Sequence, residues 1–203
     1  MTLKTSYTLL APVYDLVVEH ATRSARRTSL ERLQNGGEVL LTGIGSGLDI
    51  PFLPPGNRYT GIDLTPAMLE RARRRLAERP AHNRPDVRLI EADALRLPFA
   101  DACFDSVVMH LILAVVPRPE HALAEAARVV RPGGRILILD KFLQPGQRAP
   151  LRRLANLLMR HIATRTDVVF EDCLAVCPEL SRVDDRPALA GGWFRHIELH
   201  RKT

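Results

Sequence analysis

A glycine-rich turn follows a short apolar run at residues 38–42. The stretch VLLTGIGSGLDI, residues 39–50, carries glycine at positions 43, 45 and 47. Glycines at this spacing let the backbone turn tightly and approach a ligand closely. Because such a turn occurs in many proteins, its ligand has to be inferred from what the neighbouring strands carry.

Two carboxylates end the next two predicted strands. RYTGID, residues 58–63, ends in Asp63, twenty residues after Gly43, and DVRLIEAD, residues 86–93, ends in Asp93. A carboxylate at the first place can accept hydrogen bonds from both hydroxyls of a ribose. At the second place it can accept one from the exocyclic amine of a purine. Each residue alone would fit a simple turn, but three consecutive strand ends predict a nucleoside cofactor.

Two nucleoside cofactors compete for this turn. A dinucleotide needs a third glycine in the spacing Gly-x-Gly-x-x-Gly, and Leu48 occupies that place. S-adenosylmethionine has no phosphate, and its sulfonium and amino-acid tail fit the tighter spacing found here. The turn therefore favours S-adenosylmethionine, and an NAD(P)-dependent oxidoreductase remains the alternative.

The elements that must position these residues alternate along the chain. Apolar strands are expected at 38–42, 58–63, 86–93, 104–111 and 135–140, and helices at 6–34, 67–79, 119–130 and 149–163. Two later strands, 179–189 and 191–201, predict a hairpin at the sheet edge. The fold class is therefore α/β: a Rossmann-like, seven-stranded, mostly parallel sheet with a C-terminal antiparallel hairpin and helices on both faces.

The 203 residues are expected to form one domain, 1–203, in which the N-terminal helical segment 1–35 folds over the site. The chain has three cysteines, an odd number, which argues for a reducing compartment. Cys173 and Cys177 lack a second ligand pair, so no metal site is expected. No stretch reaches the ~18 apolar residues of a membrane span, and the first residues do not match a signal peptide. The expected location is the cytoplasm.

The net charge of +6 and the sequence pI of about 9.8 favour anionic partners. Basic helices at 22–33, 69–79 and 148–163 fit a peripheral contact with anionic membrane, and fit a solvated face equally well. Nucleic acid is not an expected partner, because aromatic residues make up only 5% of the chain and no added recognition domain or Asn-Pro-Pro-Tyr motif is present.

Together these motifs resemble the class I S-adenosylmethionine-dependent methyltransferases. The likeness runs from YD at 14–15 to HIELHR at 196–201, through VLLTGIGSGLDI, YTGIDLTPAMLERAR, EADALRLPFADACFDSVVM and RVVRPGGRILILD. Within that class the chain is similar to the short bacterial phosphatidylethanolamine N-methyltransferases, through APVYDLVV, LAVVPRPE and the basic C-terminal third. The ubiquinone and menaquinone methyltransferases are the next most similar group.

The resemblance implies a set of cofactor-binding residues. They are Gly43, Gly45 and Gly47 for the methionine tail, Asp63 for the ribose, Leu64 and Met68 beside the adenosine, Asp93 with Ala92 and Ala94 for the adenine, and His110 near the methionine end.

One position departs from the family pattern. Leu41 stands where the family usually has Glu or Asp directed toward the amino-acid end of the cofactor. Its loss should weaken cofactor binding rather than abolish the chemistry, and Thr42 or Asp49 is the expected substitute. The same departure keeps open a second class of function, a cofactor-binding module without catalysis.

Methyl transfer from a sulfonium is an in-line displacement, so proximity and orientation supply much of the catalysis. An ammonium acceptor also needs a proton acceptor. The candidates are Tyr14, on the N-terminal segment, and His110, at the end of the fourth strand. The expected acceptor is a small molecule or a phospholipid head group, with a phosphatidylethanolamine-like amine favoured. A soluble quinone, phenol or thiol is the alternative.

Overall fold

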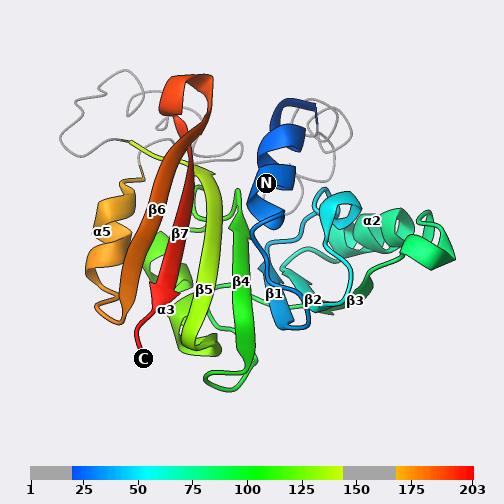
Figure 1. Ribbon diagram of the computed structural model, residues 1–203, viewed down its shortest axis with the longest axis horizontal. Coiled ribbons are helices and arrows are strands. Elements are labelled where there is room, and N and C mark those ends of the chain that lie inside the picture. The colour runs from blue at the N-terminus through cyan, green and yellow to red at the C-terminus, as the bar shows by residue number, and fades with distance from the viewer. Residues whose placement is uncertain (1–19, 144–167) are drawn as a thin grey trace.

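The computed structural model describes residues 20–143 and 168–203. Its strands are β1 (Glu38–Thr42), β2 (Arg58–Asp63), β3 (Asp86–Glu91), β4 (Phe104–His110), β5 (Val130–Lys141), β6 (Leu180–Leu189) and β7 (Phe194–Arg201). They form one sheet in the order β3-β2-β1-β4-β5-β7-β6 (Figure 1). The pairs from β3 to β5 are parallel, whereas β7 runs antiparallel to both β5 and β6. The predicted fold class is confirmed, including the hairpin at the sheet edge.

The helices connect these strands. Named elements are α2 (Pro66–Ala77), α3 (Pro119–Val129), α5 (Phe170–Ala175) and the short 3-10 helices η1 (Ile50–Phe52), η2 (Ala81–Asn83) and η3 (Ala190–Gly192). Residues 20–30 are also helical and lead into β1. The predicted helix at 149–163 and the start of the N-terminal segment lie outside the described residues.

Alternate strand residues point to opposite faces of the sheet and build two apolar cores. Leu40 of β1 and Val107 of β4 belong to the core that α3 and α5 cover. Leu41 and Val108, one residue further along each strand, belong to the core with the helix 20–30, η1 and α2. The sheet is therefore covered on both faces, as the apolar strand pattern predicts.

Several predicted boundaries are wrong, among them the end of the helix predicted at 6–34, which stops at residue 30, and the start of the strand predicted at 191–201, which is Phe194. Two other errors have a local cause. β3 ends at Glu91, not Asp93, because its pairing with β2 stops where Asp63 meets Glu91. Asp93 instead forms an isolated bridge with Arg96 in the loop that follows. β5 begins at Val130 rather than 135, because its pairing with β4 continues across a bulge.

Candidate cofactor-binding site

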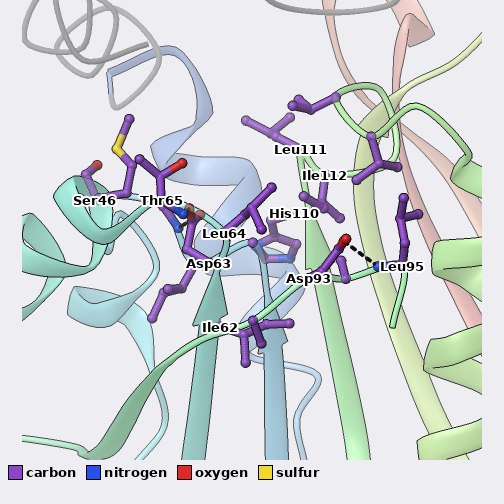
Figure 2. A pocket seen from close by; sticks show the side chains of 18 of the residues that line it. Ser46, Ile62, Asp63, Leu64, Thr65, Asp93, Leu95, His110, Leu111 and Ile112 are labelled. Carbon is purple, nitrogen blue, oxygen red and sulfur yellow. Dashed lines mark hydrogen bonds between the residues drawn. The ribbon is translucent and has the colours of Figure 1, made fainter. Parts of the chain in front are cut away.

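A cavity of about 320 Å³ opens at the carboxyl ends of the parallel strands (Figure 2). Its size lies within the usual range of small-ligand sites. The strand order reverses between β1 and β4, which is the position where open α/β sheets bind ligands. The cavity brings together most of the predicted cofactor residues: Gly43, Gly45, Asp63, Leu64, Met68, Ala92, Asp93, Ala94 and His110.

Asp63 links the tip of β2 to the glycine turn. Its Oδ2 accepts a hydrogen bond from the backbone N–H of Gly45 at 3.0 Å, and its Oδ1 accepts one from that of Thr65 at 2.8 Å. Burial raises the pKa of Asp63, and these two hydrogen bonds oppose the rise. Because a carboxylate has about four acceptor sites, Asp63 can accept further hydrogen bonds from a ligand in the cavity.

Two glycines of the turn have different tasks. Gly43 has a φ of +67°, and a Cβ there would lie 2.6 Å from Cδ1 of Ile112 in the loop after β4. Gly47 has a φ of +84°, and a Cβ there would lie 2.7 Å from Cδ1 of Ile50 and 3.1 Å from Cα of Ala72. Gly43 thus lines the cavity, whereas Gly47 does not line it and lets the turn pack closely on α2.

Asp93 stands on the far wall of the cavity, in the loop after β3. The side chain is exposed, and its Oδ1 accepts a hydrogen bond from the backbone N–H of Leu95 at 2.9 Å (Figure 2). Ala92 and Ala94 line the cavity on either side of it. Asp93 is therefore held by its own loop and keeps acceptor capacity for a ligand.

Position 41 contributes nothing polar to this site. Leu41 is 1% exposed and packs in the core with the helix 20–30. The neighbouring Thr42 donates its hydroxyl to the backbone carbonyl of Val108 at 3.0 Å. Neither residue lines the cavity. Thr42 therefore does not supply the polar contact that Leu41 lacks.

Asp49 lies at the centre of a buried network behind the glycine turn. Its Oδ1 accepts hydrogen bonds from Nη1 of Arg26 at 2.8 Å and from Nδ1 of His110 at 2.9 Å. Burial alone would raise the pKa of Asp49, but the charges and hydrogen bonds of His110 and Arg26 hold it well below its usual range. Asp49 is therefore ionised and bonded to both Arg26 and His110, and these two residues line the cavity.

Both ring nitrogens of His110 are used inside this network. An ionised Asp49 can only accept, so Nδ1 donates to it. Its Nε2 lies 2.9 Å from the Ser29 hydroxyl, which can donate to that nitrogen or accept from it. The His110 side chain is 1% exposed. This geometry fixes the imidazole between the helix 20–30 and the end of β4, and it leaves neither nitrogen open to a substrate. The other candidate proton acceptor, Tyr14, lies outside the described residues.

An apolar loop after β4 forms the remaining wall, and the sequence indicated its position through His110 without singling out its residues. Its cavity-lining residues are Leu111, Ile112, Val115, Val116 and Pro117. Leu111 has a φ of +58°, a backbone conformation that non-glycine residues rarely adopt and that clusters at functional sites. The signal available in the sequence was the apolar run of this segment directly after a strand that ends at the ligand edge. Arg26 was also missed, because a single arginine within a basic helix has no distinguishing sequence pattern.

The residues of the cavity fit a nucleoside that carries an amino-acid tail. Asp63 and Asp93 offer free acceptor sites on two sides, and the apolar side chains of Ile62, Leu64 and Met68 offer surface for a base and a ribose. Gly43 and Gly45 themselves carry no side chain that would obstruct a tail. Fold and site together define an α/β domain that binds a nucleoside cofactor.

Comparisons with known proteins identify the family. Residues 40–138 match the family described as a methyltransferase domain. A phosphatidylethanolamine N-methyltransferase of Cereibacter sphaeroides is 34% identical over 194 residues, which cover 94% of this chain and 93% of that protein. A demethylmenaquinone methyltransferase of Thermus thermophilus is 36% identical over 140 residues, covering 64% of this chain and 62% of that protein.

The solved structures agree on the fold. A geranyl diphosphate C-methyltransferase of Streptomyces coelicolor, in complex with S-adenosyl-L-homocysteine, superposes with a TM-score of 0.71 at 17% identity, covering 90% of this chain and 81% of that one. The chain belongs to the S-adenosylmethionine-dependent methyltransferases, and S-adenosylmethionine is its cofactor. When bound, that cofactor supplies an electrophilic methyl group on a sulfonium.

Proposed function

We propose that this methyltransferase acts on the primary amine of a phosphatidylethanolamine-like head group. The observation that carries the proposal is the near full-length likeness to a phosphatidylethanolamine N-methyltransferase, which extends over both the N-terminal and the C-terminal parts of the chain. The apolar loop 111–117 supports it, because an aliphatic wall suits an acceptor that brings lipid chains close to the site.

The cofactor assignments of the sequence carry over to the cavity as part of this proposal. Asp63 accepts from the ribose hydroxyls and Asp93 from the adenine amine, while Leu64 and Met68 cover the adenosine. Gly43 and Gly45 border the methionine tail. Their common presence in the lining of one cavity supports these roles. Gly47 supports the turn from behind instead.

The catalytic contribution of the described residues is mainly positional. His110 is held by Asp49 and Ser29, so it acts as a buried support of the cavity wall rather than as a free base. Tyr14 therefore stays the predicted proton acceptor for an ammonium substrate. A neutral amine needs no such group once the cavity has removed its water.

A peripheral contact with anionic lipid completes the proposal, with the protein at the cytoplasmic side of a membrane. In the described ranges no helix combines the length and apolar character needed to cross a bilayer. The helix 20–30 stands at the cavity end of the sheet (Figure 1) and carries the exposed Arg23 and Arg27. These exposed arginines favour a surface of negative phosphate groups.

The test is transfer of a radiolabelled methyl group from S-adenosylmethionine to mixed vesicles of phosphatidylethanolamine and phosphatidylglycerol. We expect labelled lipid, and at least a tenfold lower rate for the double variant Arg23→Glu, Arg27→Glu. Lys202→Glu is the control for a charge reversal away from the cavity, because Lys202 is exposed and follows the end of β7. Equal rates for the double variant and the control would contradict the membrane contact.

The likeness to a demethylmenaquinone methyltransferase supports a quinone-type acceptor as the second candidate. The same assay decides between the two when a soluble demethylated quinol replaces the vesicles. Labelled quinol without labelled lipid would overturn the phospholipid proposal and favour this alternative.

A further inference from the structure

The charges around the cavity are unevenly distributed. Among the described residues that line it, the only carboxylates are Asp63 and Asp93, which follow β2 and β3. On the opposite side, behind the first part of the glycine turn, the charged group that lines the cavity is the guanidinium of Arg26. Among the described residues that line the cavity, Arg26 is the one arginine or lysine, and it is therefore the natural partner for an anionic part of the cofactor.

Arg26 is fixed in a single orientation. Its Nε donates to the Thr22 hydroxyl at 2.9 Å, one helical turn earlier, and its Nη1 donates to Asp49 at 2.8 Å. The side chain is only 8% exposed. Within the part of the chain that the structure describes, Nη2 has no hydrogen-bond partner. A guanidinium held in this way keeps donors for one further anionic oxygen.

Asp49 determines what Arg26 can bind. The carboxylate of Asp49 is shared with His110 and does not line the cavity, so it orients Arg26 from behind without competing for the space in front. A preoriented, desolvated arginine binds a carboxylate through charge-assisted hydrogen bonds that are stronger than those formed in water. The amino-acid tail of the cofactor carries such a carboxylate.

We propose that Arg26, oriented by Asp49 and Thr22, binds the carboxylate of the methionine tail of S-adenosylmethionine. The tail is then anchored through its carboxylate, at a site where Leu41 and Thr42 offer no group for its ammonium. This inference concerns the cofactor and does not depend on which acceptor is methylated.

The test compares two ligands by calorimetry: S-adenosylmethionine, and its decarboxylated form, which keeps the sulfonium and the amine. For the wild-type protein we expect the decarboxylated ligand to bind about 10- to 100-fold more weakly, the range typical of a charge-assisted hydrogen bond. For Arg26→Met we expect the preference for S-adenosylmethionine over its decarboxylated form to fall below about threefold, because the variant has lost the guanidinium that binds the carboxylate.

Two further variants make the outcome specific. Arg26→Lys keeps the charge and should keep part of the preference. Arg27→Met removes the next arginine on the helix, which is exposed and pairs with Glu31, and should keep all of it. A wild-type protein that binds the two ligands within threefold of one another would overturn the proposal, and this comparison needs no variant to fold. It would also be overturned if Arg26→Met weakened both ligands equally, because Arg26 would then act only in packing.

Discussion

Two strands of this sheet carry an aspartate at or next to their carboxyl end. Each aspartate accepts hydrogen bonds from two backbone N–H groups, yet only one of them borders the cofactor cavity. Asp63 at the end of β2 accepts hydrogen bonds from the backbone of Gly45 and Thr65. Asp140, near the end of β5, accepts them from Ala114 at 3.1 Å and Lys141 at 2.8 Å. Asp63 lines the cavity, whereas Asp140 is 1% exposed beneath the loop 111–117 that it holds.

The difference shows that a carboxylate at a strand end is not by itself a sign of ligand binding. Both side chains satisfy backbone N–H groups and both have a raised pKa because they are buried. The two aspartates differ in accessibility, because a loop covers Asp140 and, in the described part of the chain, none covers Asp63. At β2 the chain turns away into α2 and leaves Asp63 accessible, while at β4 the apolar loop folds back and seals Asp140.

The largest effect is expected at the accessible aspartate. Asp63→Ala removes the acceptor that we propose for two ribose hydroxyls and should weaken S-adenosylmethionine binding by about 100- to 1,000-fold. Titration calorimetry measures this directly. Asp63→Asn, which keeps one acceptor oxygen, is the control and should lose less. Unchanged affinity in Asp63→Ala would contradict the assignment of the ribose site.

A smaller effect, on stability rather than affinity, is expected for Asp140→Asn. Burial raises the pKa of Asp140 to about 6 from an ordinary value of 3.8. The free energy of unfolding of the wild type, relative to that of the variant, is therefore highest below about pH 4. It falls by up to about 3 kcal/mol as the pH rises through 6.

Urea unfolding of both proteins between pH 4 and pH 7 measures this change, because taking the difference cancels the other titrating groups. The affinity for S-adenosylmethionine should stay within about threefold of the wild type. A difference in unfolding free energy that does not vary with pH would show that Asp140 is ionised without cost in the folded protein.

The smallest effect is expected at His196 on β7, which pairs with Leu139 of β5. Burial, assisted by the positive charges of Arg186 and Arg32, lowers the pKa of His196 to about 4. The neutral imidazole supports the fold fully above about pH 6.5, and that support is lost as the pH falls toward 4. His196→Gln should remove on the order of 1 kcal/mol of this acid sensitivity, after allowance for solvent screening.

The same urea experiment, extended to His196→Gln, checks the direction. The wild type should lose stability relative to the variant on acidification, which is opposite in sign to the comparison at Asp140. A wild type that gained stability relative to the variant on acidification would mean that His196 is protonated in the fold.

The sequence predicted the sheet because its signal is repeated: apolar runs separated by helical segments constrain the fold even when single boundaries are wrong. It predicted Asp63 and Asp93 as site residues because each follows a predicted strand after the glycine turn, where a nucleoside cofactor needs hydrogen-bond acceptors. It did not distinguish Gly47 from Gly43, since the packing of Ala72 against the turn is a contact between distant residues. It also did not single out Arg26, whose position at the cavity depends on how the helix 20–30 docks on the sheet.

The sheet order also has a consequence for how the protein is made. β7 follows β6 in the sequence but lies between β5 and β6, and in the described sheet β6 pairs only with β7. As the ribosome delivers the chain, β6 emerges before its neighbour and β5 keeps an open edge during that time. β5 and β6 become joined only when residues 194–201 have left the exit tunnel and pair with both strands. Translation that stalls before these residues leaves β5 and β6 without their partner and exposed to other nascent chains.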